Sequence, residues 1–260
     1  MSIPVIGTAV VTNPHWVHRL IMSVDYPVDN FVIINNNGRG EIDEELNYLT
    51  TITHNHIKKI KVCHMPSNVG CSGAWNLIIK CYMMSPYWII VNDDVSFGLG
   101  FLEEMVDTVN SDEEIGIIHG HSGEFNLGSW DLFLLRDHVV KNYGLFDENL
   151  YPAYCEDIDY LMRFINRDVK RVVSLSKPYY HGYGDNNDYN KHGSQTRKSS
   201  KLMNDAMEHA HDMNFEYMDK KWGHNWRECG PFKDPFNMQD IPISMTTYDL
   251  DFVRKKSTGF

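Results

Sequence analysis

Short apolar runs alternate with helical patterns along the first hundred residues. The most informative run occupies residues 87–91 and stops abruptly at Asn92, Asp93 and Asp94. Five consecutive apolar residues are too few to cross a membrane and are typical of a strand buried on both faces of a parallel sheet. Comparable runs, each followed by apolar positions at helical spacing, occupy residues 5–11, 31–34 and 60–65. This alternation predicts an α/β fold with a mostly parallel, twisted, doubly wound sheet flanked by helices.

The second half of the chain has a less regular pattern. We expect a helix at about 102–109, strands at 115–119, 130–135 and 169–174, and a last helix at about 199–221. The apolar face of a further helix is formed by Ile158, Leu161, Met162 and Ile165. Its first turn contains Glu156 and Asp157, where acidic side chains offset the helix dipole. Asp159 and Arg163, four residues apart, are interpreted as a surface ion pair.

The composition argues against several classes of function. With 35 acidic and 24 basic residues among 260, the formal net charge is -11, which argues against binding nucleic acid through a broad basic face. The five cysteines include no C-x-x-C pair, so neither a zinc knuckle nor a disulfide framework is indicated. The N-terminus has no basic leader, and no apolar run approaches the length of a membrane span. We therefore expect a soluble, cytoplasmic protein without a transmembrane segment.

Asp93 and Asp94 are the first candidates for chemistry. In open α/β sheets ligands bind at the carboxyl ends of the strands, and paired carboxylates there suit a hard divalent cation that holds a diphosphate. An acidic turn after a strand is the alternative. A loop at 66–73 contains two glycines and opens onto a helix, so its backbone can approach a ligand closely. A polar loop further along carries Arg197, a cation able to close on a diphosphate.

In order and spacing, these features resemble the family 2 glycosyltransferases, inverting enzymes of the GT-A fold, from about Val5 to Asn237. The matching positions are Thr12-Asn13, Asn68-x-Gly70-x-x-Gly73-Ala74-x-Asn76, Asn92-Asp93-Asp94, Gly144-x-Phe146-Asp147-Glu148, Glu156-Asp157-x-Asp159 with Arg163, His181, Lys221-Trp222-Gly223 and Pro235-Phe236-Asn237. Two positions depart from the family pattern, because Asn92 and Asn36 stand where acids are common. The departure at Asn36 leaves the base of the nucleotide open.

The resemblance implies a division of the chain. Residues 1–197 would form the GT-A catalytic domain, with a nucleotide-sugar half to about residue 97 and an acceptor half over about 98–197. Residues 198–260 would form a C-terminal helix and an aromatic tail that pack on the same domain.

The resemblance also implies roles for individual residues. Asp94 and His181 would bind Mn²⁺ or Mg²⁺, although a histidine after a strand often has a structural role instead. Asp157 would be the general base, with Glu156 beside it binding acceptor hydroxyls. The residues implied in binding the nucleotide sugar are Thr12, Asn36, Asn68, Gly70, Asn76, Asp93 and Arg197. Trp130 and Trp222 are candidates for stacking on an acceptor sugar.

The expected activity is metal-dependent transfer of a sugar from a nucleoside diphosphate to a hydroxyl of a glycan or glycoprotein. In-line displacement needs a cation at the leaving diphosphate and a base on the opposite face of the anomeric carbon, and a single displacement inverts that carbon. A UDP-sugar is the favoured donor, with GDP- and dTDP-sugars as alternatives. A sugar nucleotidyltransferase is disfavoured, since no glycine-rich basic loop follows the first strand. A carbohydrate-binding module without turnover is the alternative from another class.

Overall fold

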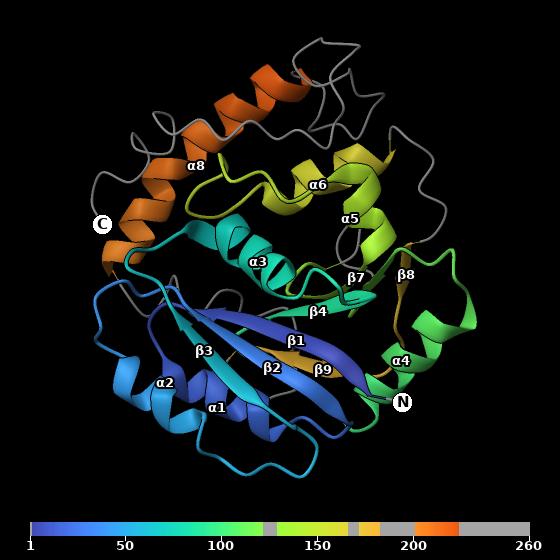
Figure 1. The fold of residues 1–260 in the computed structure, drawn as a ribbon. Helices are drawn as coiled ribbons and strands as arrows, with labels where there is room; N and C mark the ends of the chain where they lie inside the picture. Colours follow the sequence, from blue (N-terminus) through green and yellow to red (C-terminus); the bar gives the residue numbers. More distant parts are fainter. Residues whose placement is uncertain (1, 122–128, 166–171, 183–200, 224–260) are drawn as a thin grey trace.

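The computed structural model describes residues 2–121, 129–165, 172–182 and 201–223. This described part contains a seven-stranded sheet with the order β3-β2-β1-β4-β7-β6-β8 (Figure 1). Its strands are β1 (Ile3–Val10), β2 (Val28–Asn35), β3 (Ile60–His64), β4 (Tyr87–Asn92), β6 (Ile117–His119), β7 (Leu132–Arg136) and β8 (Val172–Ser174). The mostly parallel α/β sheet predicted from the sequence is confirmed.

The direction of the strands differs between the two halves of the sheet. Strands β3, β2, β1 and β4 are all parallel, as the alternation of strand and helix predicts. Strand β7 runs antiparallel to both of its neighbours, β4 and β6, whereas β8 is parallel to β6. A separate antiparallel pair joins β5 (Val95–Phe97) to β9 (Tyr179–His181). The sequence pattern did not predict this pair, because strands of three residues are too short to show a period.

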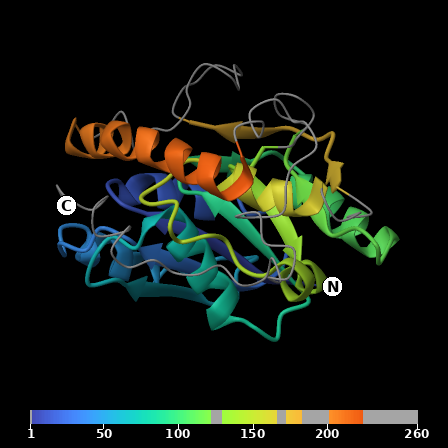
Figure 2. The same cartoon turned by 90° about the horizontal axis from the view of Figure 1, so that it is seen from above.

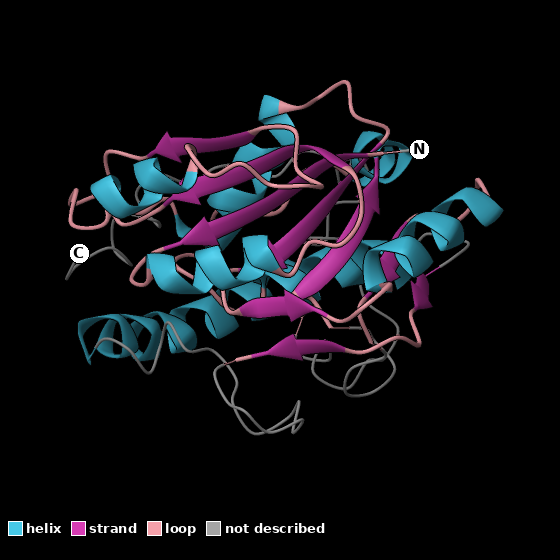
Figure 3. Cartoon of the chain, turned by 90° about the horizontal axis from the view of Figure 1, so that it is seen from below, coloured by secondary structure: helices cyan, strands magenta, loops and turns pink. Residues whose placement is uncertain are grey.

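Helices cover both faces of the sheet (Figures 1 and 3). The helices are α1 (Pro14–Met22), α2 (Asp43–Leu49), α3 (Gly70–Cys81), α4 (Phe101–Ser111), α5 (Asp137–Tyr143), α6 (Glu156–Ile165) and α8 (Lys201–Trp222). Helices α1 and α2 lie on one face, and α3, α5 and α6 lie on the other. Within the described ranges, no helix combines the length and the apolar character that spanning a bilayer requires.

Two apolar cores separate these layers. Because successive side chains of a strand point to opposite faces, neighbouring residues of β1 belong to different cores. Ile6 packs in the cluster that contains Val17 of α1, and Val5 packs in the cluster that contains Ile78 of α3. Both clusters include residues of β4 and β7, so these central strands are buried on both faces. Because β4 is packed on both faces, the position of its carboxyl end, and with it that of Asp93 and Asp94, is fixed.

Helix α8 packs on α6 and on the segment before it, partly through buried charges (Figure 2). Lys221 Nζ lies 2.7 Å from Asp147 Oδ2 and 2.6 Å from Asp159 Oδ1. Asp159 also pairs with Arg163 at 2.5 Å, and both of these side chains are 0% exposed. The interpretation of Asp159 and Arg163 as a surface ion pair is therefore wrong. Helical spacing places them on one side of α6, but only the tertiary structure shows that this side is covered.

Candidate active site

Asp94 and His181 come together at the carboxyl end of β4. Strand β5 begins directly after Asp94, and its pairing with β9 sets Val95 opposite His181. As a result, His181 Nε2 lies 3.3 Å from Asp94 Oδ1, an ion-pair distance. The Asp94 side chain is buried, and the His181 side chain is 19% exposed. The structure thus joins the two residues that the sequence proposed as metal ligands.

Asp131 completes this arrangement, and sequence reasoning missed it. Because β7 is antiparallel to β4, its first residues lie beside the last residues of β4, and Asn92 N donates to Asp131 O at 2.8 Å. The Asp131 carboxylate lies 2.9 Å from His181 Nδ1 and accepts from Tyr179 Oη at 2.8 and 2.9 Å. Burial alone would lower the pKa of His181, but hydrogen bonds to Asp131 and Asp94 and their charges raise it to about 10. The only signal in the sequence was an acid near the start of the strand expected at 130–135.

Arg19 is a second residue that the sequence pattern did not indicate. It projects from α1, and its Nη2 donates to Asp94 O at 3.2 Å and to Gly182 O at 3.0 Å. Gly182 N in turn donates to Asp94 O at 2.9 Å. Arg19 therefore fixes the backbone at Asp94 and at Gly182, the residue after His181.

Asp93 is a buried carboxylate that accepts hydrogen bonds from its own backbone amide and from that of Asp94. It is only 4% exposed, and its Oδ2 has no hydrogen-bond partner among the described residues. Burial raises the pKa of Asp93 well above its usual range, and the charge of Asp94 raises it further. A buried carboxylate oxygen without a partner is energetically unfavourable, so this atom suits a group that arrives with a ligand. We refer to Asp93, Asp94, Asp131 and His181 as the donor side.

The donor side fits a divalent cation that shares its coordination with a substrate. The imidazole of His181 is oriented by Asp131 at Nδ1, which leaves Nε2 facing Asp94, an arrangement common for metal-binding histidines. The raised pKa of His181 keeps a proton on Nε2, and a bound cation would take the place of that proton. Within the described ranges, no three His, Cys, Asp or Glu side chains are grouped closely enough to hold a metal ion by themselves. Two protein ligands are sufficient for Mg²⁺ or Mn²⁺ when phosphate oxygens and water supply the others.

The loop before α3 is held to the end of β2. Val69 N donates to Asn36 Oδ1 at 2.7 Å, and Asn36 Nδ2 donates to Gly70 O at 3.2 Å. Asn68 Oδ1 accepts from Gly70 N at 2.8 Å. Gly70 has a φ of +79°, and a Cβ there would lie 2.8 Å from the Tyr151 ring, so glycine is required for two reasons. Asn36, Asn68 and Gly70 therefore shape the loop, and their contact with a nucleotide stays a prediction.

Asn76 connects α3 to the chain that precedes α6. It is 1% exposed, and its amide exchanges hydrogen bonds with the backbone of Phe146 at 2.9 Å in both directions. Its Nδ2 also donates to Glu148 Oε1 at 2.9 Å. These contacts give Asn76 a structural role in holding the chain at residues 146–148, whereas a direct role in nucleotide binding is untested.

Glu156 and Asp157 occupy the first turn of α6, as predicted. Asp157 is half-buried, and its Oδ1 accepts from Ile158 N at 2.8 Å. Burial raises the pKa of Asp157, so desolvation outweighs the stabilisation of the charged form that the helix start provides. Burial and then the charge of Asp157 raise the pKa of Glu156 to about 8, and Glu156 Oε2 has no partner among the described residues. Because burial and the charge of Asp157 favour the protonated form of Glu156, Asp157 is the better candidate for a base.

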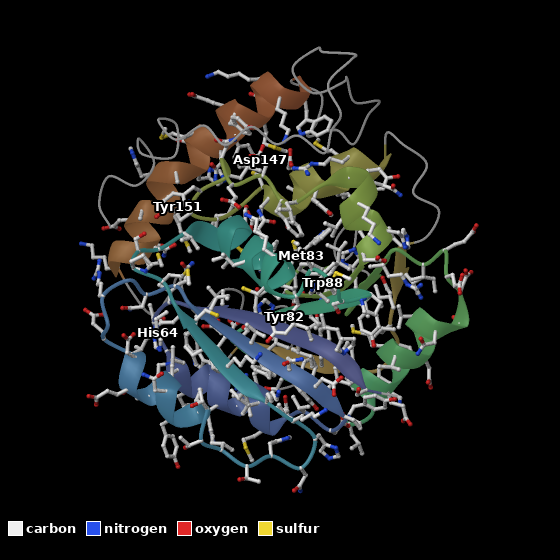
Figure 4. All side chains as sticks on the ribbon, in the orientation of Figure 1. His64, Tyr82, Met83, Trp88, Asp147 and Tyr151 are labelled. Carbon is white, nitrogen blue, oxygen red and sulfur yellow. The ribbon has the colours of Figure 1, made fainter. Side chains whose placement is uncertain are left out.

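Cys71, in the first turn of α3, contacts residues at and before the start of α6. Its thiol hydrogen-bonds to the Glu156 carboxyl, and its amide donates to Pro152 O at 2.7 Å. Burial raises the pKa of this thiol well above its usual range, and the charges of Glu156, Asp157 and Asp93 add to the effect. The backbone bond from Cys71 to Pro152 therefore places the first turn of α3 beside the turn that leads into α6. We refer to residues 147–157 as the base side (Figure 4 labels Asp147 and Tyr151 in it).

Four predicted site residues remain, namely Trp130, Trp222, Thr12 and Arg197. The prediction that Trp130 and Trp222 stack on an acceptor is not supported, because the indoles are packed in the interior. Trp130 is 8% exposed and lies edge-on to Phe133 and Phe146, whereas Trp222 is 1% exposed and donates to Asp159 Oδ1 at 2.8 Å. Thr12 lies just after β1, and Arg197 lies outside the described residues.

Comparison with known proteins adds a family and a fold. A family model described as Glycosyl transferase family 2 matches residues 14–155, from α1 to the residue before α6. A comparison with curated proteins found no match.

Solved structures share the fold at low sequence identity. S. aureus TarS 1–349 in complex with UDP-GlcNAc is 13% identical, with a TM-score of 0.54, over 84% of this chain and 72% of that one. The mannosyltransferase PcManGT from Pyrobaculum calidifontis, in complex with GDP-Man and Mn²⁺, is 12% identical, with a TM-score of 0.52, over 66% of this chain and 54% of that one. S. aureus TarS 1–349 alone is 14% identical, with a TM-score of 0.53, over 70% and 60%. The chain thus covers only part of the solved proteins it matches, and the likeness shows the GT-A fold.

Proposed function

The chain belongs to glycosyl transferase family 2, and from this membership we propose that it transfers a sugar from a nucleoside-diphosphate sugar to a hydroxyl group of a glycan or glycoprotein. One observation carries the proposal beyond the family. Asp94 and His181 lie 3.3 Å apart at the carboxyl end of β4, and Asp131 orients the His181 imidazole, an arrangement that suits a cation bound to a diphosphate. Displacement at a sugar carbon needs such a cation at the leaving group and a base on the opposite face of the reacting atom, the role we propose for Asp157.

On the donor side, Asp94 and His181 would hold Mn²⁺ or Mg²⁺, and the bound cation would offset the charge that develops on the departing diphosphate. Asp131 keeps the His181 ring in the orientation that this requires, through the 2.9 Å contact at Nδ1. Asp93, with its unpartnered buried oxygen, would accept a hydrogen bond from the donor. Arg19 keeps the backbone at Asp94 in place.

On the base side, Asp157 would take the proton from the acceptor hydroxyl as the acceptor oxygen attacks the anomeric carbon. The bond from that carbon to the diphosphate oxygen breaks, and the nucleoside diphosphate leaves with the electron pair. Because one displacement inverts the carbon, the product has the opposite anomeric configuration. A carboxylate whose pKa is raised by burial is a stronger base, provided that it remains ionised.

A UDP-sugar is the donor that we propose. Support comes from the structural likeness to TarS, which was solved in complex with UDP-GlcNAc. The likeness to PcManGT, solved with GDP-Man and Mn²⁺, supports metal dependence and makes a GDP-sugar the first alternative to test.

The test uses the full chain with Mn²⁺ or Mg²⁺ and a panel of UDP-, GDP- and dTDP-sugars. We expect release of nucleoside diphosphate from one donor class, abolished by EDTA and restored by Mn²⁺. With an accepted glycan, NMR of the product should show an inverted anomeric carbon. Glycan binding without consumption of any donor would refute the proposal and favour a carbohydrate-binding module. A product with retained configuration would refute the single displacement.

A further inference from the structure

Asn214 on α8 contacts the backbone of the turn that leads into α6. Its side chain is 0% exposed, and its Nδ2 donates to Ala153 O at 3.0 Å and to Tyr154 O at 3.2 Å. These carbonyls belong to residues just before Glu156 and Asp157. Asn214 lies about sixty positions further along the sequence, well beyond the part that matches the family model.

The turn that Asn214 holds has an unfavourable backbone. Tyr154 has a φ of 78° and Cys155 has a φ of 73°, values that residues with a Cβ rarely adopt. Such conformations persist where surrounding contacts fix them. Cys155 O then accepts from Asp159 N at 2.8 Å and begins the hydrogen bonding of α6. The two positive-φ residues therefore set the position and direction of the first turn of α6, which carries Asp157.

Three further side chains of α8, those of Tyr217, Lys221 and Trp222, hold the flanks of this turn. Tyr217 Oη and Lys221 Nζ each lie 2.7 Å from Asp147 Oδ2, before the turn, and Lys221 and Trp222 contact Asp159 after it. All of these contacts end on side chains. Asn214 differs because it bonds to the backbone of the turn at the two residues that precede Cys155 and Glu156.

We propose that Asn214 is a positioning residue for Asp157, an inference that rests on the proposed function. Through the carbonyls of Ala153 and Tyr154 it holds the turn in the conformation that aims the Asp157 carboxylate at the acceptor oxygen. Because the Asn214 side chain is fully buried, we expect it to touch neither donor nor acceptor. Its removal should therefore lower the rate of the chemical step and leave binding of the donor unchanged.

The test compares Asn214→Ala with two variants of the same helix. Asn204→Ala removes a half-buried asparagine whose Nδ2 donates to Glu208 Oε1 at 3.0 Å, far from the turn. Met218→Ala removes buried apolar packing from the cluster with Leu150 and Cys155, and so lowers stability without removing the bonds to the carbonyls. Each full-length variant is assayed with Mn²⁺ for transfer of the sugar to water, using the nucleotide sugar that the donor panel selects.

We expect Asn214→Ala to lower kcat about 10- to 100-fold, with the KM for the donor within about twofold of wild type. Hydrogen exchange of the amides at residues 153–158 should become faster. Asn204→Ala should match the wild type in all three measurements, and Met218→Ala should have a lower unfolding temperature with a nearly unchanged kcat. An isosteric Asn214→Asp variant, which lacks the amide donors, should lose as much kcat as Asn214→Ala.

Different outcomes refute the role of Asn214 and the proposed function on which it rests. If wild type consumes donor and Asp157→Asn does not, but Asn214→Ala keeps its kcat, the inference on Asn214 is wrong and the proposed function stands. The inference is equally wrong if Asn214→Ala loses kcat only as much as Met218→Ala at the same loss of stability. If wild type consumes no donor, or Asp157→Asn remains fully active, the proposed base has failed, and the role of Asn214 fails with it.

Discussion

The donor side and the base side are built in different ways. On the donor side, backbone pairing places the side chains: β4 ends at Asn92, β7 starts beside it, and β9 sets His181 opposite Val95. On the base side, residues 147–155 belong to no strand or helix, and side chains of α3 and α8 hold them, at Glu148 from Asn76 and at Asp147 and Ala153 from α8. A sheet edge tolerates the loss of one side chain better than a segment held by a few side-chain contacts. The two sides should therefore respond differently to substitution.

The largest effects should come from the two carboxylates that we propose for chemistry. Asp157→Asn keeps an oxygen that can accept from Ile158 N, so the fold should survive while the base is lost. We expect transfer to fall about 10²- to 10⁴-fold with unchanged donor binding, the usual contribution of a general base. Asp94→Asn should instead weaken metal-stimulated binding of the donor. Both quantities are measured by titration calorimetry and by release of nucleoside diphosphate.

The Asp157→Asn and Asp94→Asn variants together test which side binds the donor and which side supplies the base. If Asp157→Asn weakened donor binding and Asp94→Asn did not, the two sides would be assigned the wrong way round. Circular dichroism and thermal unfolding of each variant provide the control for folding, since both substitutions keep the shape of the side chain.

The same contrast explains what the sequence could predict. The strand at 87–91 and its two acids were predictable because five consecutive apolar residues and a sharp stop are local features. The position of Asp131 beside Asn92 was not predictable, because it depends on antiparallel pairing of β7 with β4, which no local sequence pattern indicates. The burial of Asp159 and Trp222 depends on how α8 packs on α6, a contact across about sixty residues. Motif spacing therefore located these residues but did not separate structural from chemical roles.

The second prediction concerns the buried charges of the base side. Lys221→Met keeps the length of the side chain but removes the cation between Asp147 and Asp159. We expect the free energy of unfolding to fall by about 3–5 kcal/mol, because a buried carboxylate loses a charged partner. Urea denaturation measures this change. Lys220→Met is the matched control, since Lys220 is exposed, and it should change the free energy by less than about 0.5 kcal/mol. Equal effects of the two variants would contradict the structure.

The third prediction is a dependence of stability on pH that arises from Asp147. Burial would raise the pKa of this carboxyl, but Lys221 and Arg163 outweigh burial and lower the pKa to about 2. An unfolded chain has a carboxyl pKa near 3.9, so the folded state is stabilised above about pH 4, and this stabilisation is lost as the pH falls towards 2. The loss should amount to roughly 2–3 kcal/mol.

Comparison of wild type with Lys221→Met isolates this group from other carboxyls. The difference in unfolding free energy between the two proteins should shrink as the pH falls from about 4 towards 2, because folded wild type becomes protonated at Asp147 only near pH 2. A difference that stays constant down to pH 2 would show that Lys221 does not stabilise the charged form of Asp147.

The smallest effect should come from the donor side, at Tyr179. Tyr179→Phe removes the hydroxyl that donates to Asp131 but keeps the ring, which packs against Phe101 and His121. Asp131 keeps its contact with His181, so we expect a loss of only about 1–2 kcal/mol in unfolding free energy. Tyr180→Phe, at the next residue of β9 and 40% exposed, is the control and should be nearly neutral. A loss as large as that of Lys221→Met would mean that side chains, and not strand pairing, hold the donor side, and the contrast between the two sides would fail.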